Sequence, residues 1–250
     1  MRFVKPDADS IQVPFEIERW DSTAALAEIW VKADTVHANS TTLCFVMQWG
    51  NPDAEAAVQS GAVFDTSDGF GGVWHLFEQG STEAQDATQN GFDGTMVNVE
   101  STEGSIGRAG RFSNNSSYIT MQSTAESKLD FPVGGSYSVS AWVNSDSITE
   151  NRHILSKGDV QYYLKIHNFN WHFAEYHENP VPWWGYTSSP YDIGRWVHLY
   201  GVRNGTSQYL YVNGVCVDST IAVMSGTEPR DESFDVEIGR RLLPDGSDGQ

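Results

Sequence analysis

The chain has few cysteines, few basic residues and no long apolar run. Its cysteines, Cys44 and Cys216, lie in different strand-like runs, so we expect two packed thiols rather than a disulfide. No apolar run approaches the roughly 18 residues that a membrane-spanning helix needs, so we expect no membrane insertion of this segment. The 15 basic and 33 acidic residues give a net charge of −18. This charge disfavours nucleic acid and anionic lipid as partners, and it leaves neutral glycans, cations and proteins. A plainer interpretation is that it keeps the protein soluble.

Helical signals are also scarce, whereas turn-forming residues are common. The 250 residues include 23 glycines and 9 prolines, and 39% of the residues are hydrophobic, which is enough for a core. Short strand candidates at Thr95–Val99, Gly110–Phe112 and Tyr118–Met121 are separated by turns. This pattern predicts an all-β sandwich or barrel.

The strongest local signal is a meander of three strands joined by Asn-Gly turns. The strands are Arg195–Arg203, Ser207–Val212 and Val215–Asp218, and the junctions are Asn204-Gly205 and Asn213-Gly214. Asn and Gly both tolerate the positive φ of a type I′ turn, which makes this the clearest hairpin signal. Apolar and aromatic residues occupy both faces of the second strand, so we expect the meander to pack against a second layer.

Several ordered motifs resemble a known superfamily. The segments IGRWVHLYGVRNGTSQYLYVNGVCVDST, SYSVSAWV, ILSKG and VEIGR resemble the laminin G-like domain of the concanavalin A-like lectin/glucanase superfamily. The resemblance implies an antiparallel jelly-roll β-sandwich of two sheets over residues 71–250. In that family a closing strand follows the strand that ends in IGR. The resemblance therefore implies that this chain stops at Gln250 before its last strand.

The first 70 residues carry strand candidates at Val13–Trp20, Ala25–Ala33 and Thr41–Trp49. The motifs FEIERWD, AEIWVKAD and MQWGNPDAE resemble the second half of a bacterial domain family of unknown function that commonly precedes laminin G-like modules. The resemblance implies that residues 1–70 are the C-terminal part of a β-rich domain that begins upstream. We expect the boundary at the turn-rich Asp65–Gly72, followed by the first strand of the next domain at GVWHLFE.

An aromatic segment between residues 171 and 186 is a candidate ligand site. Saccharides expose apolar C–H faces and hydroxyl groups, so exposed aromatic rings flanked by polar side chains suit them. Two prolines stiffen the segment and lower the entropy lost on binding. The alternative is that these rings pack inside the protein. The candidate ligand-binding residues are Trp171, Tyr176, Glu178, Asn179, Trp183, Trp184 and Tyr186.

A second candidate is a loop that contains Asp86 and Asn90. Carboxylate and amide oxygens suit Ca²⁺, which takes 6–8 oxygen ligands. The laminin G resemblance implies that this loop holds a structural Ca²⁺. The alternative is a loop stabilised by Asx turns without a metal. His167, His172 and His177 recur every five residues, a spacing that alternates strand faces, so we expect no zinc site along one strand.

A third pattern resembles the acidic strand of laminarinase-type glucanases, which place three acids at alternate positions of one strand. Asp235 and Glu237 share a face here, but Ser233 stands where the third acid is required. Glu232 falls on the other face. Because retaining hydrolysis needs a correctly spaced carboxyl pair, we expect no hydrolytic activity.

These features predict a non-catalytic module of an exported bacterial protein, extracellular or at the cell surface, that recognises a carbohydrate or protein ligand. A glycan or a surface protein is the expected partner. One alternative is a structural spacer of an adhesin without a ligand site, in which the aromatic segment joins two domains. A less favoured alternative is a glycoside hydrolase of the glucanase type.

Overall fold

The computed structural model describes most of the chain as β-structure in two compact units. The described residues are 1–6, 8–39, 43–53, 60–122, 128–131, 135–147, 151–158, 161–177, 183–221, 234–242 and 248–249. Unit 1 comprises Met1–Glu78, Gln85–Gly91 and Thr102–Ala109. Unit 2 comprises Gln79–Ala84, Phe92–Ser101 and Gly110–Gln250. The predicted all-β class is confirmed. No helix in the described ranges is long and apolar enough to cross a membrane.

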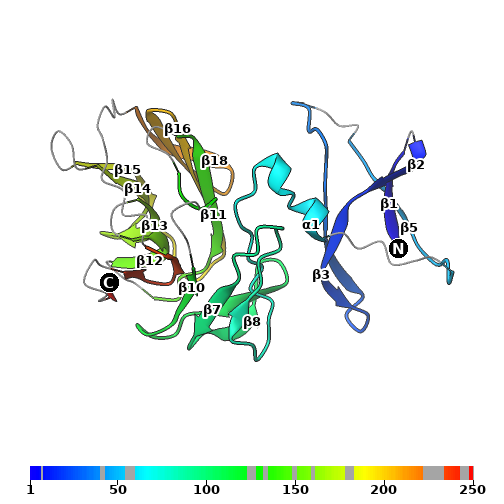
Figure 1. The fold of residues 1–250 in the computed structure, drawn as a ribbon, viewed down its shortest axis with the longest axis horizontal. Helices are drawn as coiled ribbons and strands as arrows, with labels where there is room; N and C mark the ends of the chain where they lie inside the picture. The colour runs from blue at the N-terminus through cyan, green and yellow to red at the C-terminus, as the bar shows by residue number, and fades with distance from the viewer. Residues whose placement is uncertain are drawn as a thin grey trace. The chain divides into compact units, whose positions relative to one another are not determined.

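Unit 1 contains two small antiparallel sheets. Its elements are β1 (Arg2–Lys5), β2 (Ala8–Val13), β3 (Phe15–Asp21), β4 (Leu26–Val31), β5 (Val46–Gln48), α1 (Ser60–Val63) and the 3-10 helix Thr66–Asp68 (Figure 1). One sheet has the order β2-β1-β5 and the other pairs β3 with β4. The buried apolar side chains among the described residues of unit 1 are Val4, Val13, Phe15 and Val63. The two strands predicted around residues 13–33 are therefore confirmed, with shifted ends.

The expected strand at GVWHLFE is wrong. Within the described residues 72–78 the only strand-like pairing is an isolated β-bridge between Trp74 and Asp86. Leu76 has a φ of +60°, which is incompatible with extended backbone. The backbone of Val73 instead bonds to the later loop, because its N–H donates to Asp86 Oδ1 (3.0 Å) and its carbonyl accepts from Ala87 N (2.8 Å). Unit 1 thus continues to Glu78 and includes the loop Gln85–Gly91.

Unit 2 contains a larger and a smaller antiparallel sheet. The larger has the order β15-β14-β13-β12-β19-β10-β7-β6, and the smaller has the order β11-β16-β17-β18. The larger sheet consists of β6 (Glu83–Ala84), β7 (Gly94–Val97), β10 (Tyr118–Met121), β12 (Asn151–Lys157), β13 (Tyr162–His167), β14 (Asn170–His177), β15 (Trp183–Pro190) and β19 (Val236–Ile238). The smaller consists of β11 (Tyr137–Val143), β16 (Val197–Asn204), β17 (Ser207–Val212) and β18 (Val215–Ile221). Two hairpins, β8 (Glu100–Glu103) with β9 (Arg108–Arg111) and β20 (Arg241–Leu242) with β21 (Asp248–Gly249), complete the strands.

The two sheets of unit 2 enclose one apolar core, to which both contribute. Its buried members are Leu164, Ile166, Trp171, Phe173, Val197, Leu199 and Leu210. Gly201 allows the sheets to approach, since a Cβ there would lie 2.4 Å from the Phe173 ring. The larger sheet thus has an inner face on the core and an outer face turned away from it.

The predicted meander is confirmed as β16, β17 and β18, but only one of its turns has the predicted residues. Asn213 and Gly214 have φ values of +51° and +80°, as a type I′ turn requires. Asn204 pairs with Ser207 inside the ladder, so Gly205 (φ +57°) takes the first central position of the other turn. Glycine at that position is typical of a type II′ turn.

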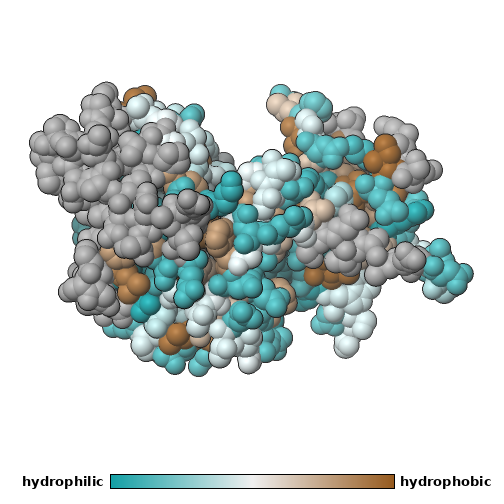
Figure 2. All heavy atoms as spheres, in the orientation of Figure 1, coloured by the Kyte–Doolittle hydropathy of each residue, from teal (hydrophilic) through white to brown (hydrophobic). Residues whose placement is uncertain are grey.

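Both cysteines are free and exposed, so the predicted packing of the thiols is wrong. Cys216 lies on β18, an edge strand whose residues Val215 and Val217 are also exposed. On the face drawn in Figure 2, much of the coloured surface is hydrophilic and the hydrophobic patches are small. Scattered exposed apolar residues of this kind are normal for a folded protein.

We predict that Leu210→Ala will lower the free energy of unfolding by about 2–5 kcal/mol, because Leu210 is fully buried between the sheets. Val215→Ala on the neighbouring strand is the matched control, since Val215 is 63% exposed and should change stability by at most about 0.5 kcal/mol. Urea unfolding measures both. Equal effects of the two substitutions would contradict the assignment of the core.

Candidate functional site

The aromatic segment forms a hairpin of two strands rather than a loop. β14 pairs with β15, and the register sets Tyr176 opposite Trp184, His177 opposite Trp183, and Ala174 opposite Tyr186. Aromatic residues favour strands, which explains this outcome. Glu178 and Asn179 lie outside the described residues. For Tyr176, Trp183, Trp184 and Tyr186 the structure describes the backbone alone.

Strand register divides the predicted ligand residues between the two faces of the larger sheet. Trp171 faces the core and is fully buried, so the predicted role of its ring in stacking on a ligand is wrong. Trp183 falls at a register position of this inner set. Tyr176, Trp184 and Tyr186 fall at positions of the outer set, together with His172.

A row of polar side chains crosses the outer face beside these positions. Register places Lys165 of β13 between His153 of β12 and His172 of β14. The Lys165 ammonium lies 4.6 Å from the centroid of the Tyr163 ring. The rings of His167 and His172 meet edge to face, with centroids 5.3 Å apart. We call His153, Tyr163, Lys165, His167 and His172 the outer polar row.

The outer polar row contains two uncharged imidazoles beside a cation. Burial, together with the charge of Lys165, lowers the pKa of His153 to about 3. Burial, followed by the charges of His167 and Lys165, lowers the pKa of His172 to about 4. A neutral imidazole has one N–H donor and one acceptor nitrogen, but both rings are buried, since His153 is 4% exposed and His172 is 8% exposed. Lys165 and His167 are the partly exposed members of the row. Sequence analysis missed it because the row exists only across paired strands.

The outer polar row differs from a metal site. In the described part of the chain, no group of three or more His, Cys, Asp or Glu side chains has a geometry that could hold a metal ion. The spacing argument considered one strand at a time, whereas His167 and His172 meet across the β13–β14 hairpin. His177 belongs to β14, and its side chain is outside the description.

In the predicted calcium loop, the side chains of Asp86 and Asn90 make hydrogen bonds within unit 1. Asp86 Oδ1 accepts from the backbone N–H groups of Val73 (3.0 Å) and Thr88 (2.9 Å), and Oδ2 accepts from Thr88 Oγ1 (2.8 Å). Asn90 Nδ2 donates to the carbonyl oxygen of Gly71 at 2.8 Å. Asn90 thus directs its nitrogen, not its oxygen, at that carbonyl. This arrangement is that of a loop stabilised by Asx turns. As it stands, it does not fit the donor set of a calcium site. Calcium binding therefore stays a prediction.

The acidic strand that resembles glucanases places Glu237 inside the protein. Glu237 is fully buried, and its carboxylate accepts from Arg240 Nε (2.9 Å) and Thr120 Oγ1 (3.0 Å). Burial raises the pKa of Glu237, and the hydrogen bonds and charge of Arg240 oppose that rise. The carboxylate of Glu237 is thus held by two partners within the protein. Glu232 and Ser233 lie outside the described residues.

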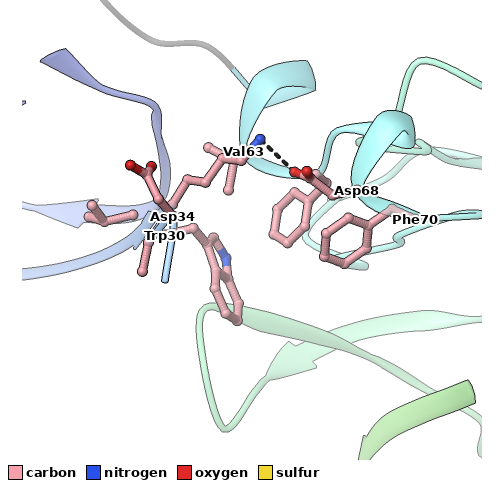
Figure 3. A pocket seen from close by; sticks show the side chains of 9 residues that line it. Trp30, Asp34, Val63, Asp68 and Phe70 are labelled. Carbon is pink, nitrogen blue, oxygen red and sulfur yellow. Dashed lines mark ion pairs between the residues drawn. The ribbon is translucent and has the colours of Figure 1, made fainter. Parts of the chain in front are cut away.

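Unit 1 contains a cavity that sequence analysis did not anticipate. Its volume is about 620 Å³, and it lies between β4 and the segment that follows α1 (Figure 3). Its lining residues are Trp30, Val31, Lys32, Ala33, Asp34, Val63, Phe64, Asp68 and Phe70. The aromatic residues come from distant parts of the sequence, so no local pattern could have revealed the cavity.

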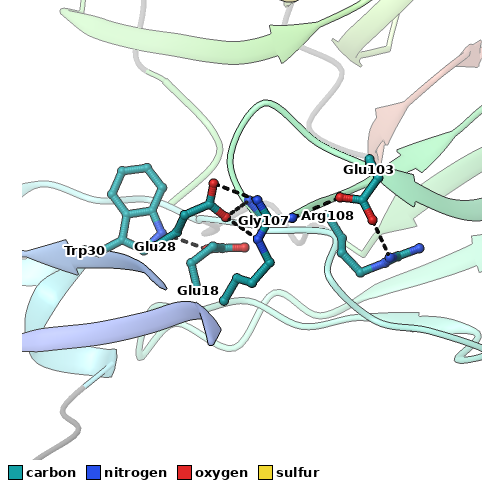
Figure 4. Close-up of polar contacts among 7 residues, drawn as sticks. Glu18, Glu28, Trp30, Glu103, Gly107 and Arg108 are labelled. Carbon is teal, nitrogen blue, oxygen red and sulfur yellow. Dashed lines mark hydrogen bonds and ion pairs between the residues drawn. The ribbon is translucent and has the colours of Figure 1, made fainter. Parts of the chain in front are cut away.

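A network of charges lies beside this cavity (Figure 4). Glu18 Oε2 accepts from Trp30 Nε1 (2.7 Å). The same oxygen lies 2.8 Å from His75 Nδ1. Burial alone would lower the pKa of His75, but the close contact with Glu18 and the charges of Glu16 and Glu18 outweigh it and raise this pKa to about 9. His75 is therefore a cation at neutral pH.

A second part of the network surrounds the hairpin tip between β8 and β9. Arg19 Nε lies 2.8 Å from Glu28 Oε2, and Arg19 Nη1 donates to Glu103 Oε2 (2.9 Å). Gly107 N donates to Glu28 Oε2 (2.7 Å), and Arg108 Nη1 donates to Glu103 Oε1 (3.2 Å). Gly107 has a φ of +58°, and a Cβ there would clash with Glu18. These contacts join the tip to β3 and β4 within unit 1.

Comparison with known protein families confirms both predicted resemblances. Residues 113–249 match the family described as the concanavalin A-like lectin/glucanases superfamily. Residues 1–77 match the Domain of unknown function (DUF2341). No curated protein matches the chain.

Solved structures similar to the chain share its fold at low identity. The receptor binding domain of botulinum neurotoxin C/D mosaic serotype has 13% identity and a TM-score of 0.52, over 66% of this chain and 41% of that chain. The botulinum neurotoxin serotype D ligand binding domain, in complex with N-acetylneuraminic acid, has 13% identity and a TM-score of 0.54, over 68% and 42%. This chain therefore spans about two fifths of the length of these structures.

We predict that the stability of unit 1 will fall as the pH rises from 6.5 through about 9. The pKa of His75 is raised above its ordinary 6.5, so its charged form contributes stability fully below pH 6.5 and loses that contribution as the pH passes about 9. Urea unfolding across this range checks it. His75→Gln should flatten the dependence over the same interval. An unchanged slope in the variant would show that another group is responsible.

We also predict that Asp86→Ala will destabilise unit 1 by about 1–3 kcal/mol in excess chelator, because three hydrogen bonds are lost without involvement of a metal. Glu83→Ala, at an exposed position nearby in the sequence, is the control. Melting temperatures with and without Ca²⁺ test the calcium prediction separately. A rise in melting temperature with Ca²⁺ that Asp86→Ala abolishes would support a metal site, and no loss of stability in chelator would refute the Asx-turn interpretation.

Proposed function

The chain belongs to the concanavalin A-like lectin/glucanases superfamily, and from this premise we propose that unit 2 is a non-catalytic module that binds a carbohydrate. The observation that carries the proposal is the outer face of the larger sheet. There the outer polar row lies in register with the backbone positions of Tyr176, Trp184 and Tyr186.

The composition of this face is what a saccharide requires. A sugar ring has apolar C–H faces that stack on aromatic rings, and its hydroxyls need both donors and acceptors. Lys165, which is partly exposed, supplies donors, and the neutral His172 beside it is buried, with 8% of its surface exposed. The strands hold these groups more rigidly than a loop would, which lowers the entropy lost on binding.

The same site is proposed to lack hydrolytic chemistry. Glu237 is buried and held by Arg240 and Thr120, which leaves it poorly placed to attack a glycosidic bond. One similar structure was solved with N-acetylneuraminic acid. For this reason sialylated glycans belong among the ligands tested, alongside neutral ones.

We further propose that the module is part of an exported bacterial surface protein and lies outside the cell or at its surface. The two matched families and the acidic composition support this location. A glycan or a surface protein is the proposed partner. The second candidate function is a spacer without a ligand site. The burial of Trp171 favours it, because this one ring is unavailable to a ligand.

We predict that a glycan array will identify a ligand and that Trp184→Ala will weaken its binding by about 2 kcal/mol, or roughly thirtyfold, because an aromatic anchor is lost. Trp142→Ala is the matched control, since Trp142 is 44% exposed on the smaller sheet. Isothermal titration calorimetry measures both variants.

Two outcomes would contradict the proposed function. Unchanged affinity in both Trp184→Ala and Tyr186→Ala would remove this face from the binding site. Release of reducing ends from laminarin, abolished by Glu237→Gln, would make the protein a hydrolase.

A further inference from the structure

We propose that unit 1 carries its own binding site for a neutral saccharide, in the cavity between Trp30, Phe64 and Phe70. This site goes beyond the proposed function, which concerns unit 2. The cavity volume of about 620 Å³ falls within the range of about 300–1,000 Å³ typical of small-molecule sites. That volume suits a mono- or disaccharide.

Aromatic rings line the cavity. The ring centroids of Trp30 and Phe64 are 5.7 Å apart, those of Phe64 and Phe70 are 5.4 Å apart, and both pairs meet edge to face. In Figure 3 the rings of Trp30 and Phe70 project into the space below Val63. Phe70 is 40% exposed, so its ring is accessible from solvent. Such rings provide apolar surfaces for the C–H faces of a sugar.

The charged groups of the lining are paired with groups of opposite charge. Lys32 Nζ lies 2.5 Å from Asp68 Oδ2 and 3.9 Å from Asp65 Oδ2. Asp34 forms an ion pair with Lys5. A cationic ligand would meet the Lys32 ammonium, and an anionic ligand would meet the Asp68 carboxylate. Hydroxyl groups donate to a carboxylate and accept from an ammonium, so a neutral polyhydroxylated ring matches both members of the pair.

The aromatic wall is held in place before any ligand arrives. Glu18 Oε2 accepts from Trp30 Nε1 (2.7 Å), which fixes the orientation of the indole ring. The His75 ring packs against Trp30 and Phe64, with centroids 5.9 Å and 5.2 Å away. His75 is itself held by Glu18, at 2.8 Å. A wall ordered in this way loses little entropy on binding.

The test follows the indole N–H signal of Trp30 in nitrogen-15 NMR spectra of the full chain, identified by its loss in Trp30→Phe. Cellobiose, maltose and lactose are added up to tens of millimolar. We expect a saturable shift of the Trp30 signal with at least one of them. Phe70→Ala should weaken the binding at least about tenfold, and so should Asp68→Asn, which keeps the shape of the side chain. Phe77→Ala is the matched control, because Phe77 is 41% exposed in the same unit.

The same titration contains the outcomes that would overturn the proposal. A shift of the Trp30 signal with choline or glucuronate, but with none of the neutral sugars, would assign the site to a charged ligand. No shift with any neutral sugar, or equal weakening by Phe77→Ala, would also refute it. Trp184→Ala should leave the Trp30 response intact, so failure of the glycan array and failure of this site are measured independently.

Discussion

The mutual burial of two sheet faces is the constraint on which unit 2 depends. The core residues of β13 and β14 pack on those of β16 and β17, and the close approach requires glycine at position 201. A cluster of polar contacts crosses this interior. Glu175 of the larger sheet bonds to Arg203 and Tyr137 of the smaller one. Burial and the nearby Glu175 charge raise the pKa of Tyr137, so its hydroxyl stays protonated and donates.

This burial decides which face of the larger sheet each residue occupies. Because successive residues of a strand alternate between faces, fixing Trp171 and Phe173 in the core commits His172 to the outer face. The buried Glu175–Arg203 pair is costly to desolvate and costlier still to break, since either charge alone would be left uncompensated. Loss of either partner should therefore destabilise the packing of β14 on the smaller sheet.

Unit 1 has a small apolar interior and depends on charged contacts as well. Its strands are short, and a few charged contacts supplement a small interior. The most buried of them, Glu18 with His75 and Trp30, connects β3, β4 and the segment after the 3-10 helix. The same contacts orient the aromatic wall of the cavity, so in this unit the stabilising network and the proposed site share residues.

The sequence by itself determined the all-β class, the family and the three strands of the meander, because turn chemistry and alternation act over a few residues. It identified the aromatic stretch of β14 and β15 but could not assign its faces. Alternation shows that Trp171 and His172 face opposite ways, whereas only packing against β16 and β17 decides which of them joins the core between the sheets. The row of His153, Lys165 and His172 likewise required the pairing of three strands. The cavity of unit 1 required the approach of segments more than 30 residues apart, such as Trp30 and Phe64. These features depend on contacts between distant residues, which only the tertiary structure decided.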